Sequence, residues 1–484
     1  MDTSKLKKGC LIVFLCYIVI AVMFYWIAGE QLHYQAVATN EVSASAAVGE
    51  ITKDIVLKQS FIPEADELNG ISFLISTYER NNTSIICIQI TDESGKTISF
   101  NDIQTSTLND NSYVNLTFDD PIPLKKGSKY DIIISSNDGT AGNAVTFWMG
   151  NAISVPRGQV ALDMNSVEPL YINGESSNNV LVFQLQMRNK LSFGHYYWYY
   201  ALFVALLLAA YLIFLINKQK KGDNFWGIRL INVFKRYRFL MKQLISRDFK
   251  TRYKRSVLGV LWSFLNPLLT MSVQYLVFST LFKSNIPNFA MYLLAGIVCY
   301  SFFNESTNLS LTSITGNATL ITKVYMPKYI YPLSRVLSSS INLLFSLIPL
   351  IIVMVISRLP ITKSILLLPF GVICLIAFCT GMGFLLSTLM VFFRDTQFLW
   401  NIVGMLWMYA TPIFYPESII PQRLMPMFKC NPLYHIIRFM RSIFIEGVSP
   451  APKAYLFCII ASFVPLLIGA LVFKKNQDKF ILNL

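Results

Sequence analysis

Charged residues are scarce in this sequence. Only 14% of its 484 residues are Asp, Glu, Lys or Arg, whereas 54% are hydrophobic, and the mean hydropathy is +0.48. A soluble domain carries roughly a quarter charged residues. The composition therefore excludes an ordinary soluble protein and indicates an integral membrane protein.

Cysteine and histidine are too few, or too scattered, for the sites they usually form. Of the eight cysteines, Cys87 alone lies away from the apolar runs and their borders, so no disulfide framework is expected. The three histidines are far apart in the sequence and suggest no metal site.

Motifs of nucleotide binding and hydrolysis are absent as well. The sequence has no GxxxxGK[ST] loop to hold nucleotide phosphates, and no Gly-x-Ser-x-Gly, HExxH or paired Cys-x-x-Cys. Carboxylates in the apolar C-terminal runs are nearly confined to Glu305, with Asp395 at the end of one run, and isolated carboxylates do not make an acid–base pair. We expect a chain that is not an enzyme, carries no cofactor and binds no nucleic acid.

The charges that are present are sorted along the chain. Residues 30–193 include 19 acidic and 10 basic residues, a net charge of −9, whereas residues 217–256 include 13 basic and 2 acidic residues, a net charge of +11. Cationic segments stay on the cytoplasmic side of a membrane, and an anionic segment can cross it. The sorting predicts that the first region lies outside and the second inside.

Eight or so apolar runs predict transmembrane helices. The first, Gly9–Ala28, is interpreted as an uncleaved anchor, with a signal peptide as the alternative. The second, Tyr197–Ile216, begins among aromatic residues and is followed by lysines. Six more runs are Leu258–Phe282, Met291–Leu311, Val336–Ile356, Ile365–Phe392, Phe398–Phe414 and Ala454–Phe473. Three prolines interrupt Ile419–Phe444, which is interpreted as an external re-entrant hairpin.

Between the first two spans the sequence pattern is typical of β-strands. Short runs of alternating polarity are separated by turn residues such as Asn69-Gly70 and Lys126-Gly127. The runs are Ile71–Ser76, Ile85–Thr91, Tyr113–Phe118, Tyr130–Ser135, Ala144–Met149 and Val180–Met187. They predict an antiparallel, all-β jelly-roll or sandwich domain.

The chain is thus predicted to be an α-helical polytopic membrane protein with an added β-domain. Its expected parts are a transmembrane anchor (1–29), an extracellular β-sandwich (30–193), a second transmembrane helix (194–217), a basic amphipathic helix at the cytoplasmic membrane face (218–256) and a six-helix domain (257–484).

Several groups of residues follow one another from about Phe239 to the C-terminus. They are Leu244-x-x-Arg247-Asp248-x-Lys250-x-Arg252-Tyr253-Lys254-x-Ser256-x-Leu258-Gly259-x-Leu261-Trp262, Asn317-x-x-Leu320-Ile321-x-Lys323-Val324-Tyr325-x-Pro327, Tyr331-Pro332-Leu333-Ser334, Phe392-Phe393-Arg394-Asp395, Thr411-Pro412-x-Phe414-Tyr415-Pro416 and Asn431-Pro432. In this order they resemble the ABC transporter permeases that export O-antigen, capsule or teichoic acid. The N-terminal anchor and β-domain depart from the ordinary pattern of that family.

The resemblance implies a function and a set of partners. Two copies of the chain would pair with two separate ATPase subunits, which would hold ATP and Mg²⁺, and would export a polyprenyl-linked glycan across the bacterial plasma membrane. The loop after the second permease span would dock on the ATPase; its candidate residues are Asn317, Lys323, Tyr325, Pro327 and Pro332.

The basic block before the first permease span has two interpretations. Its cations either hold the pyrophosphate of a lipid-linked glycan at a cytoplasmic gate, or anchor the chain among anionic lipid headgroups. The residues are Arg247, Lys250, Arg252, Lys254 and Arg255.

Aromatic residues are candidates for glycan contacts, because sugar C–H faces stack on rings. Core packing is the alternative in each case. Candidates for a channel, with one carboxylate among them, are Trp262, Tyr300, Phe303, Glu305, Trp400, Trp407 and Tyr415. Candidates for an external glycan platform are Tyr78, Tyr113 and Trp148.

The leading hypothesis is the membrane subunit of an ATP-driven exporter of a lipid-linked polysaccharide. Two alternatives remain open at this point. One is a membrane glycosyltransferase with an external sugar-binding domain, and the other is an ABC exporter of small lipids or drugs.

Overall fold

A computed structural model describes residues 3–37, 44–150, 168–221, 226–254, 258–259, 261–281, 288–323, 326–421 and 423–483. Contacts divide the chain into two compact units. The helical unit comprises Met1–Leu32, Phe193–Pro416 and Arg423–Leu484, and the β-unit comprises His33–Ser192 with Glu417–Gln422.

The β-unit contains two antiparallel sheets. The seven-stranded sheet has the order β1-β13-β4-β9-β12, with β2 paired to β9 and β7 paired to β4. Its strands are β1 (Tyr34–Val37), β2 (Ala46–Ala47), β4 (Glu67–Ser76), β7 (Ser112–Pro123), β9 (Thr146–Gly150), β12 (Val180–Leu181) and β13 (Phe183–Lys190). The six-stranded sheet has the order β11-β10-β3-β8-β5-β6. Its strands are β3 (Leu57–Phe61), β5 (Ile85–Thr91), β6 (Thr97–Gln104), β8 (Tyr130–Ser136), β10 (Tyr171–Ile172) and β11 (Glu175–Ser176).

One hydrophobic core joins the two sheets. Alternate residues of β4, such as Ile71 and Phe73, pack in one cluster with Ile88 of β5 and Ile132 of β8. Because successive side chains of a strand point to opposite faces, this alternation buries one face of each sheet. The predicted all-β sandwich is confirmed, and strands β3 and β6 add to the runs that the sequence pattern identified.

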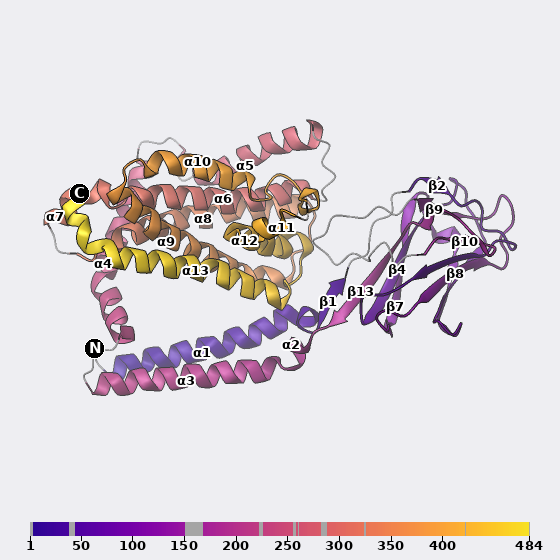
Figure 1. The fold of residues 1–484 in the computed structure, drawn as a ribbon, viewed down its shortest axis with the longest axis horizontal. Helices are drawn as coiled ribbons and strands as arrows, with labels where there is room; N and C mark the ends of the chain where they lie inside the picture. Colours follow the sequence, from indigo (N-terminus) through magenta and orange to yellow (C-terminus); the bar gives the residue numbers. More distant parts are fainter. Residues whose placement is uncertain are drawn as a thin grey trace. The chain divides into compact units, whose positions relative to one another are not determined.

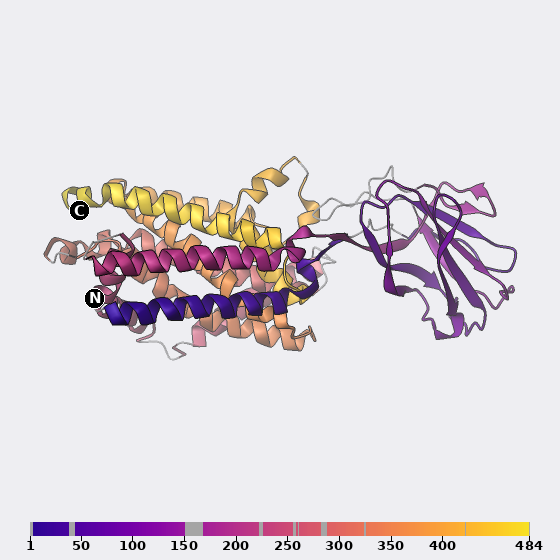
Figure 2. The ribbon, with the colours of Figure 1, turned by 90° about the horizontal axis from the view of Figure 1, so that it is seen from below.

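The helical unit is a bundle of long helices with short helices at its ends (Figures 1 and 2). The long helices are α1 (Thr3–Ala28), α3 (Tyr197–Lys220), α4 (Trp226–Tyr253), α5 (Leu261–Leu276), α6 (Phe289–Leu311), α8 (Ile330–Ile356), α9 (Leu368–Phe392), α10 (Thr396–Tyr409) and α13 (Pro452–Asn476). The short ones are α2 (Ser192–His195), α7 (Ala318–Lys323), α11 (Met425–Lys429), α12 (Pro432–Arg441) and α14 (Phe480–Asn483).

The two ends of the helical unit differ in composition. The start of α1, the end of α3, α7 and the C-terminus lie at one end in both views, and this end is called the basic end (Figures 1 and 2). Lys218 and Lys220 close α3 there, and Lys474 and Lys475 lie in the last turn of α13. Helix α11 lies toward the opposite end, which is called the α12 end (Figure 1).

Helices α1 and α3 form an antiparallel pair. The hydroxyl of Tyr17 donates to the backbone oxygen of Ala201 at 2.8 Å, and that of Tyr197 donates to the oxygen of Ala21 at 2.7 Å. Near the end of α1, the ring of Phe24 meets that of Tyr455 of α13 edge-on, at 5.0 Å between centroids. The chain leaves this unit after Leu32 and returns at Phe193, next to the aromatic end of the pair.

Six helical stretches within the described residues are long and apolar enough to cross a membrane. They are Leu6–Leu32, Tyr197–Lys220, Leu261–Ser279, Ile330–Ile356, Lys363–Phe392 and Pro452–Asn483. The predicted spans Met291–Leu311 and Phe398–Phe414 form α6 and α10 but are not among the six. Helix α10 has 14 residues, or about 21 Å at 1.5 Å per residue, which is shorter than a hydrocarbon core of about 30 Å. Helix α6 is apolar in its first half but carries Asn304, Glu305 and further polar residues in its second half.

Two glycines allow α9 and α13 to approach closely. A Cβ added at Gly381 would lie 2.5 Å from the Cα of Leu466, and one added at Gly469 would meet the backbone oxygen of Gly381. Small residues at a crossing bring membrane helices into direct backbone contact. This crossing therefore fixes the spacing of the two helices.

We expect Gly469→Val to destabilise the helical unit, because the added side chain has no room beside the backbone of α9. Overpacking of this kind costs roughly 1–3 kcal/mol. The measurement is the thermal unfolding of the full chain in detergent. Gly9→Ala in α1 is the matched control, since nothing lies within 4 Å of a Cβ there. Equal melting temperatures for Gly469→Val and the natural chain would contradict the close crossing.

A buried carboxylate links the neighbouring strands β4 and β13 of the seven-stranded sheet. Glu67 is 8% exposed, and it pairs with Arg188 at 2.7 Å and with Lys190 at 2.9 Å. Burial alone raises the pKa of Glu67, but the hydrogen bonds and charges of Lys190 and Arg188 outweigh this and hold the pKa below its usual value. The ion pairs therefore stabilise the β-unit while Glu67 is ionised.

We expect the β-unit to lose stability as the pH falls through the lowered pKa of folded Glu67. A carboxyl group with a depressed folded-state pKa stabilises fully above its unfolded value of about 4.3 and loses that contribution in acid. Glu67→Gln should flatten the dependence of unfolding on pH between about 5 and 3. The control is Glu175→Gln, an exposed position on β11. An unchanged acid slope in Glu67→Gln would show that the pair contributes nothing.

Candidate functional site

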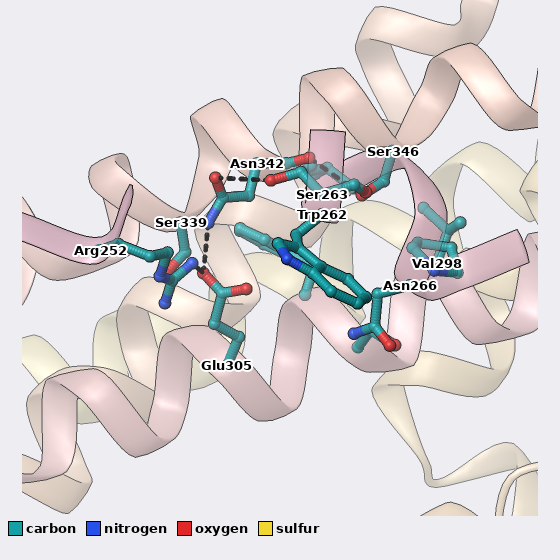
Figure 3. Close-up of a pocket in the computed structure, with 13 residues that line it drawn as sticks. Arg252, Trp262, Ser263, Asn266, Val298, Glu305, Ser339, Asn342 and Ser346 are labelled. Atoms are coloured by element: carbon teal, nitrogen blue, oxygen red, sulfur yellow. Dashed lines mark hydrogen bonds and ion pairs between the residues drawn. The ribbon is translucent and has the colours of Figure 1, made fainter. Parts of the chain in front are cut away.

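The predicted basic block ends beside a polar pocket in the helical unit. The pocket has a volume of about 500 Å³ and lies among α4, α5, α6 and α8 (Figure 3). Arg252 points into it from α4, Glu305 from α6 and Trp262 from α5, as Figure 3 shows. The structure therefore brings together Arg252, which was predicted to hold a phosphate or lipid headgroup, and Glu305 and Trp262, which were predicted to line a channel.

Glu305 is the centre of the hydrogen bonds in this pocket. Its Oε1 accepts from Nη1 of Arg252 at 2.5 Å and from Nδ2 of Asn342 at 2.9 Å. Asn342 in turn accepts through Oδ1 from the hydroxyl of Ser263 at 3.3 Å. The side chain of Ser346 donates to the backbone oxygen of Ser263 at 3.0 Å. These bonds connect four helices through one carboxylate.

A local turn places Trp262 at the pocket. Gly259 adopts a left-handed conformation with φ of +51°, which glycine reaches without steric cost. The backbone oxygens of Leu258 and Gly259 then accept from the N–H groups of Leu261 and Trp262 at the start of α5. The Leu-Gly-x-Leu-Trp part of the first motif is therefore a helix-starting turn that sets the indole beside Arg252.

A second pocket of about 460 Å³ lies next to the first and shares Arg252 and Asn342 with it. The Asp248 side chain, 8% exposed, pairs with Arg247 and with Arg335 of α8, each at 3.0 Å. A carboxylate this deeply buried is stable only beside opposite charges. Sequence reasoning missed the role of Arg335, and its only signal was a cation at the start of a long apolar helix.

The two pockets together hold three guanidinium groups and two carboxylates. Each Arg already has a carboxylate partner: Asp248 for Arg247 and Arg335, and Glu305 for Arg252. An anionic ligand at these guanidinium groups would therefore share them with a carboxylate or displace it. Lys250 and Lys254 are exposed on the same stretch of chain, and Arg255 lies outside the described residues.

Three of the predicted channel aromatics lie in the core of the helical unit. Phe303 is 1% exposed and Trp400 is 6% exposed. The ring of Phe303 packs on Phe378, Trp400 and Trp407, with centroids 5.3 to 6.0 Å apart. The prediction that Phe303 and Trp400 line a channel is wrong, because rings enclosed by neighbouring helices do not reach a surface of the chain. Trp407 is partly buried in the same cluster.

The other predicted channel residues have different surroundings. Trp262 is 46% exposed at the first pocket. The hydroxyl of Tyr300 donates to the backbone oxygen of Gly404 at 2.6 Å and so ties α6 to α10. Tyr415 follows the end of α10, and its hydroxyl donates to the backbone oxygen of Tyr409, the last residue of that helix, at 2.5 Å. Of these three, Trp262 lines the first pocket.

Helix α10 ends in a broken segment that two side chains hold. Asn431, the N-cap of α12, donates to the hydroxyl of Thr411 at 2.8 Å and accepts from the indole N–H of Trp407 at 2.9 Å. Arg441 is 7% exposed, donates to the backbone oxygens of Pro412 and Ile413, and stacks on the ring of Tyr292 at 3.3 Å. Sequence reasoning missed Arg441, and its only signal was a cation within the proline-interrupted run Ile419–Phe444. The predicted hairpin region contains α11 and α12.

The predicted coupling segment forms a compact turn at the basic end. Ile321 of α7 is buried in a cluster with Tyr331 and Phe480, while Lys323 is exposed. Asn317 is 9% exposed and donates to the oxygen of Ser313 at 2.7 Å. The ammonium of Lys328 donates to the backbone oxygen of Gln477 at 2.6 Å and ties the segment to the C-terminus.

The prolines of this segment flank the start of α8. Pro327 is partly exposed, and Pro332 is buried in the first turn of the helix, where its oxygen accepts from the hydroxyl of Ser310 at 3.4 Å. Tyr325 lies outside the described residues. Helix α7 is therefore a short helix with exposed side chains, and the residues that follow it, Lys328 and Pro332, are held rigidly by the rest of the bundle.

The predicted platform residues meet at one end of the seven-stranded sheet. Tyr113 of β7 is 44% exposed, and Tyr78, just after β4, is 40% exposed. Trp148 of β9 is partly exposed, and its indole N–H donates to Oδ1 of Asn111 at 3.2 Å. None of the three is a core residue, so the core-packing alternative is wrong for them.

Comparison with known proteins identifies the C-terminal half. Residues 240–445 match the family model of the ABC-2 type transporter. An O-antigen export system permease protein RfbA of Myxococcus xanthus is 32% identical over 257 residues, which are 52% of this chain and 98% of that protein. A Klebsiella pneumoniae protein of the same name is 32% identical over 244 residues, 50% of this chain and 93% of its own length. The polysialic acid transport protein KpsM of Escherichia coli is 21% identical over 249 residues, 50% of this chain and 95% of that protein.

These relatives are named as transport proteins, two of them as permeases, which supports a permease over the glycosyltransferase alternative. The matched region begins in α4, so α1, the β-unit and α3 precede it. Permeases of this type work with a separate ABC ATPase subunit. The chain belongs to the ABC-2 type transporter family and is a polysaccharide-export permease of it.

Proposed function

We propose that this chain forms, as a homodimer with two ATPase subunits, an exporter of a lipid-linked cell-surface polysaccharide in the bacterial plasma membrane. The observation that carries the proposal is the 32% identity to O-antigen export permeases over nearly their whole length. Arg252 and Trp262 line a polar pocket, and Lys250 and Lys254, which flank Arg252 in the sequence, are exposed.

The basic end is proposed to face the cytoplasm. Lysines lie at the start of α1, the end of α3 and the end of α13, and cytoplasmic ends of transmembrane helices are enriched in Lys and Arg. Each of α1 and α3 is long enough to cross the membrane once. The chain between them, which forms the β-unit, is therefore proposed to lie on the extracytoplasmic side, where it guides or recognises the emerging glycan.

The first pocket is proposed to receive the diphosphate of the lipid carrier. A diphosphate offers oxygens that match the fork of a guanidinium group. Arg252 would exchange Glu305 for the diphosphate, and Lys250 and Lys254 would attract it from the membrane surface. Glu305 and Asn342 then hold Arg252 in place while the site is empty.

The test of this role is a charge swap. We expect Arg252→Ala to lower export at least tenfold, and the double variant Arg252→Glu with Glu305→Arg to restore thermal stability but not export. The swapped pair keeps the ion pair and removes the guanidinium from α4. The measurement is cell-surface polysaccharide, and Lys242→Ala, an exposed cation on the same helix, is the control. Restored export in the swapped variant would show that the pair is structural only.

Helix α7 is proposed to dock on the ATPase subunit. Its exposed side chains include Thr319, Thr322 and Lys323, while Ile321 anchors it in the bundle. Because Lys328 and the C-terminal segment brace its base, a push on α7 is transmitted to α8 and α13. This arrangement allows α7 to transmit the movements of the ATPase subunit during nucleotide hydrolysis to the helices of the channel.

We expect Lys323→Glu to weaken the copurification of the ATPase and to lower ATP hydrolysis by the assembled complex several-fold, with the fold of the chain unchanged. The control is Lys8→Glu in α1, which makes the same charge reversal at the basic end but before the matched region. Full ATPase recovery with Lys323→Glu, or equal loss with Lys8→Glu, would contradict the docking role.

A further inference from the structure

The outer face of the seven-stranded sheet has an ordered surface of uncharged side chains. Core residues alternate with outward residues on β4, β7 and β13, and the strand register places the outward ones in three rows. The rows are Tyr113 with Leu74, then Asn115 with Ser72 and Gln184, then Thr117 with Gly70 and Gln186. No member of these rows is ionisable within the pH range of a cell surface.

The first row is aromatic on both sides of Leu74. Trp148 follows Phe147, which pairs with Ile75, so Trp148 lies beside β4 across from Tyr113. Its indole donates to Asn111, the residue that precedes β7, and therefore extends across the end of β4. Two partly exposed rings flanking one leucine form an apolar plate that suits the C–H face of a sugar ring.

The second and third rows offer hydrogen-bonding groups. The hydroxyl of Ser72 donates to Oδ1 of Asn115 at 2.6 Å, and Nε2 of Gln186 donates to Ser72 at 3.3 Å. Asn115, Thr117 and Gln186 are exposed, so amides and hydroxyls remain at the surface. Gly70 has no side chain, and a Cβ there would lie 2.5 Å from the oxygen of Leu116. The neighbouring strands therefore close over the backbone at Gly70, and this row presents Thr117 and Gln186 at the surface.

The loops that frame the plate are held in strained conformations. Tyr78, Glu79 and Asn111 are three of the six described non-glycine residues with positive φ. Oδ1 of Asp110 accepts from the hydroxyl of Ser76 at 2.7 Å and from the N–H of Thr77 at 2.6 Å, which fixes the loop after β4. Backbone strain of this kind persists where the surroundings enforce it and is frequent at binding sites.

Charges around the face are paired or negative. Arg80 pairs with Glu50 at 2.5 Å and lies over the ring of Tyr78, 4.9 Å from its centroid, and Arg188 of β13 pairs with Glu67 of β4 at 2.7 Å. Asp110 lies beside the plate. A carboxylate or phosphate on a ligand would lose water there and would have to compete with Glu50 or Glu67 for a cation, in a region whose net charge is −9 over residues 30–193, with 19 acidic and 10 basic residues.

We propose that this outer face binds a stretch of uncharged polysaccharide, with Tyr113 and Trp148 as stacking residues and Asn115 and Gln186 as hydrogen-bonding residues. The inference rests on the proposed export function only in taking the exported polymer as the ligand. It separates the candidate substrates, since a neutral O-antigen-like chain fits the face, whereas polyanions such as teichoic acid or polysialic acid do not.

The test is equilibrium binding of the full-length chain, in detergent and without nucleotide, to an array of purified bacterial surface polysaccharides, some uncharged and some anionic. We expect binding to one or more uncharged polymers, and at least a tenfold loss of affinity in Tyr113→Ala and Trp148→Ala. Phe100→Ala is the matched control, because Phe100 is 57% exposed on β6 of the other sheet. Tyr113→Phe keeps the ring and should retain most of the affinity.

Tighter binding of anionic polymers, no binding of any uncharged polymer, or an equal loss in Phe100→Ala would overturn the proposal. Thermal unfolding of each variant separates lost binding from lost fold. Because the assay uses neither ATP nor the ATPase subunit, its result is independent of export. If binding fails while Arg252→Ala still abolishes export, the proposed binding face is rejected and the export function stands. If binding occurs while Arg252→Ala leaves export unchanged, the binding face stands and the proposed export function alone is rejected.

Discussion

The helical unit depends on one constraint, which is that a polar group among apolar helices needs a partner from another helix. Glu305 shows the constraint most clearly. An ionised carboxylate in such surroundings is costly, and Arg252 of α4 together with Asn342 of α8 offsets that cost. This pair and that of Asp248 with Arg335 therefore hold the amphipathic helix α4 against the bundle.

The same constraint operates at the α12 end with backbone groups in place of a carboxylate. Helix α10 stops after 14 residues, and the carbonyl groups that follow Thr411 have no helix to accept from. Arg441 of α12 binds the oxygen of Pro412, and Asn431, the N-cap of α12, binds the oxygen of Ala410 just before Thr411. Between the two polar ends, the ring of Phe303 packs on those of Phe378 and Trp400. The bundle is thus fixed at both ends by hydrogen bonds and in the middle by ring packing.

Much of this fold was predictable from the sequence, because the signals are local. Apolar length identified the long helices, and alternation identified β4, β5, β7, β8, β9 and β13. The sites were less predictable, because they depend on which faces meet. Trp262 and Trp400 are both tryptophans of apolar helices, yet the first lines a pocket and the second is enclosed. The role of Arg441 depends on the carbonyl groups of Pro412 and Ile413, which are distant in the sequence. Tyr113 and Trp148 lie 35 positions apart, and only strand register brings them to one row.

The architecture of the N-terminal half follows from the position of α4. The permease requires α4 at the basic end, where Arg252 meets Glu305. Two antiparallel spans return the chain to the end from which it started, whereas one span would leave it at the other end. Helices α1 and α3 are such a pair, held together by the hydroxyl groups of Tyr17 and Tyr197. The β-unit, which lies between them in the sequence, is therefore added in front of the permease helices without contributing any of its described residues to the pocket of Arg252 and Glu305.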